Sequence, residues 1–112
     1  MTEISGIVIE GKKEGGRLGY PTANIIVAGE GLEGVYSGWI VIDSKEYLAA
    51  LFAKNGRNII EAHVLNFEGD LYGKEVKIKI GKWIRDTVSY ESDEQMKKLI
   101  EQDIKIIKEL EK

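Results

Sequence analysis

The feature that most constrains the fold of this chain is a change of hydrophobic period late in the sequence. Before Ser92, short apolar segments rich in β-branched residues are separated by turns, most of which contain glycine, whereas the tail carries apolar residues at helical spacing. Two of these turns are expected at residues 43–45 and 68–70. Short segments of that composition, bounded by turn residues, are typical of β-strands. The sequence therefore predicts five or six strands and then one helix. The segments expected to form strands are 4–10, 22–27, 35–42, 46–54, 57–67 and 75–80.

The tail carries the signals of a helix start and of an amphipathic helix. Ser92 and Gln95 are spaced for a capping box, and Asp93 and Glu94 stand in the first turn, where the helix dipole favours negative charge. The remaining apolar residues fall on one stripe, so the helix should lie against the body of the protein. That stripe comprises Met96, Leu99, Ile100, Ile104, Ile106, Ile107 and Leu110.

The strands need protection for their edges, and closing a sheet into a barrel removes edges altogether. The segments 46–54 and 57–67 flank Asn55-Gly56, a dipeptide favoured at the centre of a tight hairpin, so these two segments should pair. A chain of 112 residues has room for one domain, residues 1–112. We therefore expect an all-β-dominated fold, a small antiparallel barrel with a C-terminal helix packed on it.

Charge and composition exclude several kinds of site. A formal net charge of −3 argues against the broad basic surface that non-specific nucleic-acid binding needs. With no cysteine and a single histidine, a bound metal should be a hard cation held by oxygens. The sequence contains neither an apolar run of membrane-spanning length nor the layout of a signal peptide. We expect a cytoplasmic monomer without nucleic-acid or membrane partners.

A glycine-rich segment, residues 11–19, precedes the motif Pro21-Thr22-Ala23-Asn24. In an extended chain, the side chains of Thr22 and Asn24 point to the same side. Their oxygens could bind Mg²⁺ or a phosphate, while backbone N–H groups of the glycine loop approach the anion. Alternatively, both side chains bond the nearby turn, as threonine and asparagine often do.

Glu61 is an unusual residue within an apolar segment. Strand alternation places it on the same face as His63, and a covered carboxylate without a partner would be costly there. One explanation is catalysis, because a carboxylate at the floor of a site can accept a proton from a hydroxyl nucleophile. The other is a partly exposed face, or neutralisation by Arg57 or a lysine. A single histidine on the wall of a barrel, such as His63, is more often a structural hydrogen-bond partner than a ligand.

Trp83, Arg85 and Tyr90 form a further polar and aromatic cluster after the last expected strand. They could face a planar ligand by stacking and hydrogen bonding, or they could form the hinge that packs the helix. Asp103 lies among the apolar positions of that helix, so we expect its carboxylate to bond a backbone amide or Arg85.

Taken in order, these segments resemble riboflavin kinase over nearly the whole chain. The stretch from Leu18 to Asn24, Leu-Gly-Tyr-Pro-Thr-Ala-Asn, is the most specific match. The other matching blocks are Gly11 and Gly15, Gly34-Val35-Tyr36, Glu61-Ala62-His63, Asp70-Leu71-Tyr72-Gly73, Ile84-Arg85 and Asp103 in the terminal helix.

The resemblance implies a six-stranded antiparallel Greek-key β-barrel that phosphorylates the riboflavin 5′-hydroxyl to FMN with ATP. It implies that Thr22 and Asn24 hold Mg²⁺, or another divalent cation, and the phosphates, and that Glu61 is the general base. It also implies a stand-alone kinase domain that stops at FMN. The nucleotide contacts implied are Gly11, Arg17, Thr22, Asn24, Val64, Asn66 and Tyr72, and the flavin contacts are Arg85 and Tyr90.

Three other functions compete with this hypothesis. The first is a non-enzymatic flavin- or nucleotide-binding barrel of the same fold, although a pure binder has no need of a base such as Glu61. The second is a small barrel that binds oligonucleotides, which the net negative charge disfavours. The third is a kinase for another planar alcohol.

Overall fold

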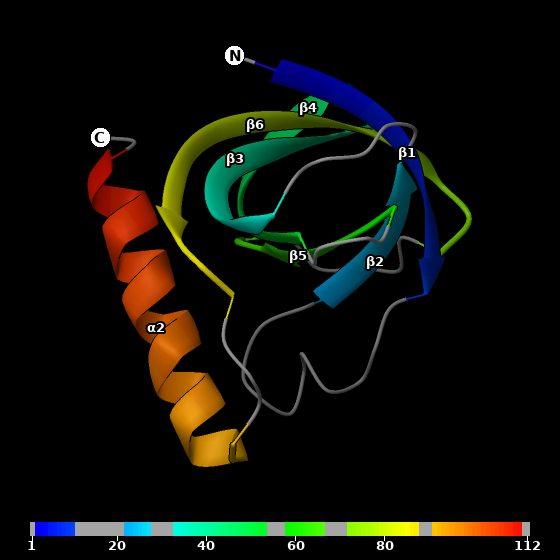
Figure 1. Cartoon of the computed structure of the whole chain (residues 1–112). Coiled ribbons are helices and arrows are strands. Elements are labelled where there is room, and N and C mark those ends of the chain that lie inside the picture. Colours follow the sequence, from blue (N-terminus) through cyan, green and yellow to red (C-terminus); the bar gives the residue numbers. More distant parts are fainter. Residues whose placement is uncertain are drawn as a thin grey trace.

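The described part of the chain forms a closed barrel of antiparallel strands with one helix on its outside (Figure 1). The computed structural model describes residues 2–10, 22–27, 33–53, 58–66, 72–87 and 91–110. The elements are β1 (Thr2–Glu10), β2 (Thr22–Val27), β3 (Gly34–Ile42), β4 (Lys45–Ala53), β5 (Ile59–Val64), β6 (Glu75–Arg85) and α2 (Asp93–Leu110). The strand order around the barrel is β1-β2-β5-β4-β3-β6. Because β6 returns to pair with β3 of the β3-β4-β5 meander, the topology is a Greek key, and the expected barrel and helix are confirmed.

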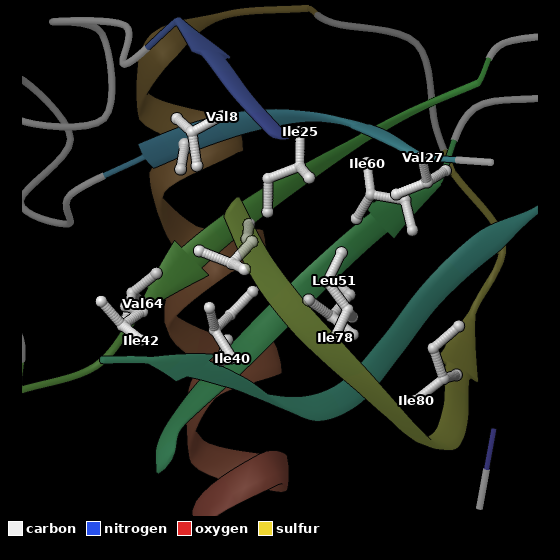
Figure 2. Packing of buried hydrophobic residues seen from close by; sticks show 14 of the residues in the cluster. Val8, Ile25, Val27, Ile40, Ile42, Leu51, Ile60, Val64, Ile78 and Ile80 are labelled. Atoms are coloured by element: carbon white, nitrogen blue, oxygen red, sulfur yellow. The ribbon is translucent and has the colours of Figure 1, made fainter. Parts of the chain in front are cut away.

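The barrel interior is filled by alternate residues of all six strands (Figure 2). On β5, Ile60, Ala62 and Val64 point inward, so Glu61 and His63 lie on the outer face. Several alanines line the interior beside isoleucine and valine, as suits the narrow space inside a barrel of few strands. The faces predicted from strand alternation are therefore confirmed for this strand.

The hairpin between β3 and β4 turns within two residues. Asp43 and Ser44 have φ angles of 50° and 70°, and the flanking Ile42 and Lys45 are paired. Positive φ at both central residues defines a type I′ turn, whose twist matches that of the strands it joins. The turn predicted at residues 43–45 is thus confirmed.

Strand β6 is longer than the sequence predicts. We expected a strand over 75–80 and a separate cluster from Lys82 onward, but the strand continues to Arg85. The pairing of β3 with β6 is irregular around Tyr36, and the buried Ser37 hydroxyl accepts the backbone N–H of Lys82 at 2.9 Å. The prediction was wrong because these bulges interrupt the alternation of side chains by which a strand is recognised.

Helix α2 begins where the sequence predicts and packs against the β4–β5 side of the barrel. The hydroxyl of Ser92 accepts the N–H of Gln95 at 3.1 Å, as an N-cap should. Ile100 and Ile104 pack with Leu65 of the barrel. Two residues assigned to the apolar stripe are instead exposed, Ile106 at 43% and Leu110 at 38%, because the barrel covers a narrower stripe centred on residues 100, 103, 104 and 107.

The hairpin between β4 and β5 forms in a different register from the predicted one. A two-residue turn at Asn55-Gly56 would place Phe52 opposite Ile59, whereas Phe52 pairs with Glu61. A shift of two residues leaves every side chain on its original face, so the hydrophobic pattern could not reveal it. Asn55-Gly56 itself, the glycine segment 11–19 and the turn expected at 68–70 lie outside the described residues. No helix in the described part combines the length and apolar character needed to cross a membrane.

Candidate active site

Two of the predicted site residues stand directly opposite each other on neighbouring strands. Asn24 of β2 is paired with Glu61 of β5, and the backbone of Thr22 is paired with that of His63. Ala23 and Ile25 point into the barrel, so Asn24 lies on the same outer face as Glu61. The structure therefore brings Asn24 and Glu61 together from segments far apart in the sequence, and the strand pairing explains their proximity.

A β-bulge lies beside Asn24. In the pairing of β1 with β2, Val8 is opposite Ile25 and Glu10 is opposite Asn24, so the register shifts between Val8 and Glu10. Bulges often stand next to functional sites because they redirect the chain that follows. Here the bulge lies just before the glycine-rich segment 11–19, which is outside the described residues.

Glu61 and His63 make close contact along the outer face of β5. The distance from Nε2 of His63 to Oε1 of Glu61 is 3.3 Å. The side chain of His63 is 3% exposed, whereas that of Glu61 is 35% exposed. The carboxylate thus has a buried imidazole on one side and access to solvent on the other, as a proton acceptor for an external hydroxyl needs.

A second group of side chains extends from this contact to helix α2. Phe52 and His63 meet edge to face, with ring centroids 4.9 Å apart and planes at 74°. The guanidinium carbon of Arg85 lies 5.8 Å from the centroid of the Phe52 ring. Arg85 also donates to both carboxylate oxygens of Asp103, at 2.9 and 2.8 Å, which confirms the expected Asp103–Arg85 bond. Strand β5, which carries Glu61 and His63, is therefore connected to α2 through Phe52 and Arg85.

Arg85, predicted to contact the flavin, is already engaged within the protein. Besides its two bonds to Asp103, it donates to the backbone carbonyl of Asp86 at 2.9 Å. These bonds use three of the five N–H groups that a guanidinium carries. Of the two roles considered for Arg85, packing of the helix is the one that these contacts support, and the flavin contact stays a prediction. Tyr90 lies outside the described residues.

The remaining predicted nucleotide contacts are dispersed. Val64 is 1% exposed and packs inside the barrel, so a ligand on the outer face could reach only its backbone. Asn66 is exposed and has a positive φ of 58°, and Tyr72 is 68% exposed. Gly11 and Arg17 lie outside the described residues. These nucleotide contacts stay predictions.

The side chains of this site suit a cation whose other oxygen ligands come from a nucleotide and from water. Among the described residues, no group of three or more His, Asp or Glu side chains is placed to hold a metal ion. Nucleotide-bound Mg²⁺ usually keeps several waters and takes its other oxygens from phosphates and one or two protein groups. The amide oxygen of Asn24, opposite the Glu61 carboxylate, is a hard donor of that kind.

Phe52 is the residue of this region that sequence analysis missed. Its place on the outer face follows from strand alternation, but its position beside Glu61 depends on the register of the β4–β5 hairpin. The two-residue turn expected at Asn55-Gly56 would have placed it next to Ile59 instead. No signal in the sequence distinguishes the two registers, because both keep Phe52 outside the barrel.

Comparison with known proteins identifies the family. The family model for riboflavin kinase matches residues 1–111. A bifunctional riboflavin kinase/FMN adenylyltransferase of Buchnera aphidicola is 36% identical over 93% of this chain, which covers 37% of that protein. The RNA-binding riboflavin kinase RibR of Bacillus subtilis is 30% identical over 96% of this chain and 50% of its own length. The chain thus spans half or less of the length of these curated relatives.

Comparison of the fold with solved structures supports the same family. The crystal structure of riboflavin kinase from Trypanosoma brucei matches with a TM-score of 0.67 and 26% sequence identity, over 96% of this chain and 78% of that one. The family model, which matches residues 1–111, covers all six strands and α2 and therefore the residues from which the candidate site is built. The chain therefore belongs to the riboflavin kinase family.

Proposed function

We propose that this chain transfers the γ-phosphoryl group of ATP to the 5′-hydroxyl of riboflavin, forming FMN and ADP. Membership of the riboflavin kinase family supports the reaction class. The observation that carries the residue assignment is the pairing of Asn24 with Glu61 on the outer face of two adjacent strands. A metal- or phosphate-binding amide and a proton acceptor are thereby available in one place.

The Glu61 carboxylate acts as the general base in this proposal. It accepts the proton of the ribityl 5′-hydroxyl while that oxygen forms a bond to the γ-phosphorus. The bond between the γ-phosphorus and the bridging oxygen breaks, and the electron pair leaves with ADP. Phosphoryl transfer depends mainly on in-line positioning and on neutralising the charge of the phosphate oxygens.

Thr22 and Asn24 would hold the divalent cation together with the nucleotide phosphates. Bound there, the cation would neutralise the negative charge of the phosphates during transfer. The protein contributes fixed donors from a strand, and a strand holds a side chain more rigidly than a loop does. Gly11, Arg17, Val64, Asn66 and Tyr72 are proposed along the nucleotide, and Arg85 and Tyr90 along the flavin.

The test is chromatographic detection of FMN from riboflavin, ATP and Mg²⁺. We expect Glu61→Gln to lower kcat by about 10²- to 10⁴-fold with little change in ligand binding, because a general base contributes about that much. Glu46→Gln is the matched control, since Glu46 is an exposed strand carboxylate that pairs with Lys79 on the outside of the barrel. Its kcat should equal that of the wild type.

Two outcomes would overturn parts of the proposal. A folded wild-type protein that binds riboflavin and ATP but makes no FMN would favour the non-enzymatic binding barrel. Normal turnover by Glu61→Gln would remove Glu61 as the base while leaving the reaction intact. A substrate panel distinguishes a kinase for another planar alcohol, because riboflavin would then be a poor substrate.

We also propose that the chain acts as a cytoplasmic monomer without a nucleic-acid or membrane partner. Its net charge of −3 supports weak RNA affinity, although one relative is named an RNA-binding riboflavin kinase. Titration with single- and double-stranded RNA at two salt concentrations tests this. Tight, salt-sensitive binding would contradict it.

A further inference from the structure

His63 is the one histidine of the chain, and the reaction proposed above assigns it no role. It lies two residues beyond Glu61 on the same face of β5, with its Nε2 at 3.3 Å from the carboxylate. Both side chains make further interactions besides this one. A buried imidazole in contact with a half-exposed carboxylate is well placed to restrict the motion of that carboxylate.

The imidazole is itself fixed by its surroundings on the outer face. Ala50 of β4 is paired with His63 and leaves room for the ring, and Phe52 contacts it edge to face at 4.9 Å. Phe52 in turn lies under the guanidinium of Arg85, which is held by Asp103 of α2. Phe52, which is itself in contact with a side chain anchored on α2, therefore restricts the orientation of the ring.

We propose that His63 is a positioning residue that holds the Glu61 carboxylate in its working orientation by donating its Nε2–H to Oε1. The inference rests on the proposed role of Glu61 as the general base. A partly exposed glutamate otherwise samples several rotamers, and a misplacement of about 1 Å at a reacting group can cost about 100-fold in rate. A hydrogen bond from a fixed imidazole ring keeps the Glu61 side chain in one rotamer.

Kinetics of two variants separate hydrogen bonding from packing. His63→Phe keeps an aromatic ring against Phe52 but has no N–H, whereas His63→Gln has an amide N–H that can reach about the position of Nε2. We expect His63→Phe to lower kcat by about 10- to 100-fold, with the KM values for ATP and riboflavin changed by less than about twofold. His63→Gln should recover most of the lost kcat.

Ile60→Val is the matched control for loosening of β5. Ile60 is 2% exposed on the same strand but points into the barrel, so its variant should lose stability and keep its kcat. The proposal is overturned if His63→Phe turns over like the wild type, or if His63→Gln and His63→Phe lose equal activity. A wild-type protein that makes no FMN would instead overturn the proposed function itself.

A spectroscopic measurement tests the contact without turnover. Because the chain has a single histidine, its imidazole nitrogens can be assigned in a long-range ¹H–¹⁵N spectrum of the wild type without further variants. At one fixed pH we expect Nε2 to carry a proton, and we expect its signal to shift in Glu61→Leu, which has no acceptor. An imidazole protonated at Nδ1 alone would overturn the proposal, as would a Nε2 signal unchanged by Glu61→Leu.

Discussion

Arg85 at the end of β6 holds the carboxylate of Asp103 in the middle of α2 through two hydrogen bonds, at 2.9 and 2.8 Å. Asp103 is 2% exposed, while the side chain of Arg85 retains 21% exposure. The pair joins the helix to the barrel. It lies on the buried stripe of α2, beside Ile100 and Ile104, which pack against the barrel. The helix is therefore held by this specific polar contact in addition to hydrophobic burial.

Removing one partner of this pair should destabilise the protein more than removing both. Arg85→Met leaves the Asp103 carboxylate buried without its guanidinium, which typically costs about 3–5 kcal/mol for a buried pair. The double variant Arg85→Met/Asp103→Leu should recover much of that loss, because an apolar pair of similar volume fits the interface. Urea denaturation gives the free energies of unfolding. Equal losses in the single and double variants would contradict this coupling.

The control for that experiment is the ion pair between Lys98 and Glu94 on the solvent side of α2. Its nitrogen and oxygen are 3.6 Å apart, and both side chains are mostly exposed. Exposed pairs of this kind contribute about 0.3–0.5 kcal/mol. Lys98→Gln, which leaves Glu94 and its interaction with the helix dipole in place, should therefore change the free energy of unfolding by no more than about this amount.

Gly38→Ala should be strongly destabilising because two strands meet closely there. A Cβ at this position would clash with the backbone carbonyl oxygen of Lys79 and would lie 2.6 Å from Cδ1 of Leu51. Overpacking of a tight interior costs about 1–3 kcal/mol, and the backbone atom on β6 cannot move aside easily. Thermal unfolding measures the loss. Gly73→Ala, with φ at +79° but no atom within 4 Å, should lose only about 1–2 kcal/mol from backbone strain.

Ser92→Ala should weaken the start of α2. The substitution removes the acceptor for the N–H of Gln95 and should cost about 1 kcal/mol. Ser92→Asp keeps an acceptor and adds negative charge near the positive end of the helix dipole, so its stability should match or exceed that of the wild type. Equal losses for the two variants, measured by chemical denaturation, would show that the cap contributes nothing here.

The ion pair between Lys79 and Glu46 should contribute to stability only below strongly alkaline pH. The hydrogen bond to Glu46 holds the pKa of Lys79 above its usual value of 10.5, and the charges of Glu46 and Glu3 add to it, while partial burial acts in the opposite direction. A raised folded-state pKa means that the stabilisation is complete below the unfolded pKa and is lost as pH rises through the folded one. The stability advantage of the wild type over Lys79→Met should therefore decrease as pH rises through the folded-state pKa of Lys79. A difference that grows with pH would contradict this assignment.

Asn24→Ala should change the metal requirement more than the chemistry. If Asn24 holds the cation, losing its amide oxygen should raise the Mg²⁺ concentration needed for half-maximal FMN formation by about tenfold or more. Excess Mg²⁺ should restore much of kcat in Asn24→Ala but not in Glu61→Gln, because the latter lacks the proposed base. Identical Mg²⁺ dependence in the wild type and Asn24→Ala would exclude Asn24 as a ligand.

Local sequence signals were sufficient wherever a structure depends on nearby residues. The Ser92 cap, the turn at Asp43-Ser44 and the inward and outward faces of β5 all follow from propensity, capping chemistry and alternation over a few positions. The motif of Thr22 and Asn24 and the outward-facing Glu61 could likewise be identified before the fold was known. Their physical basis is local, because strand geometry alone determines which side chains share a face.

Only the tertiary structure decided which of these local features meet. Closure of the barrel places β2 beside β5 and so brings Asn24 opposite Glu61. The register of the β4–β5 hairpin places Phe52 next to Glu61, and the bulged extension of β6 carries Arg85 to Asp103. A register shift of two residues leaves the hydrophobic pattern unchanged, and bulges interrupt the alternation by which a strand is recognised. The free energy that selects between them comes from packing between segments distant in sequence, which no local pattern records.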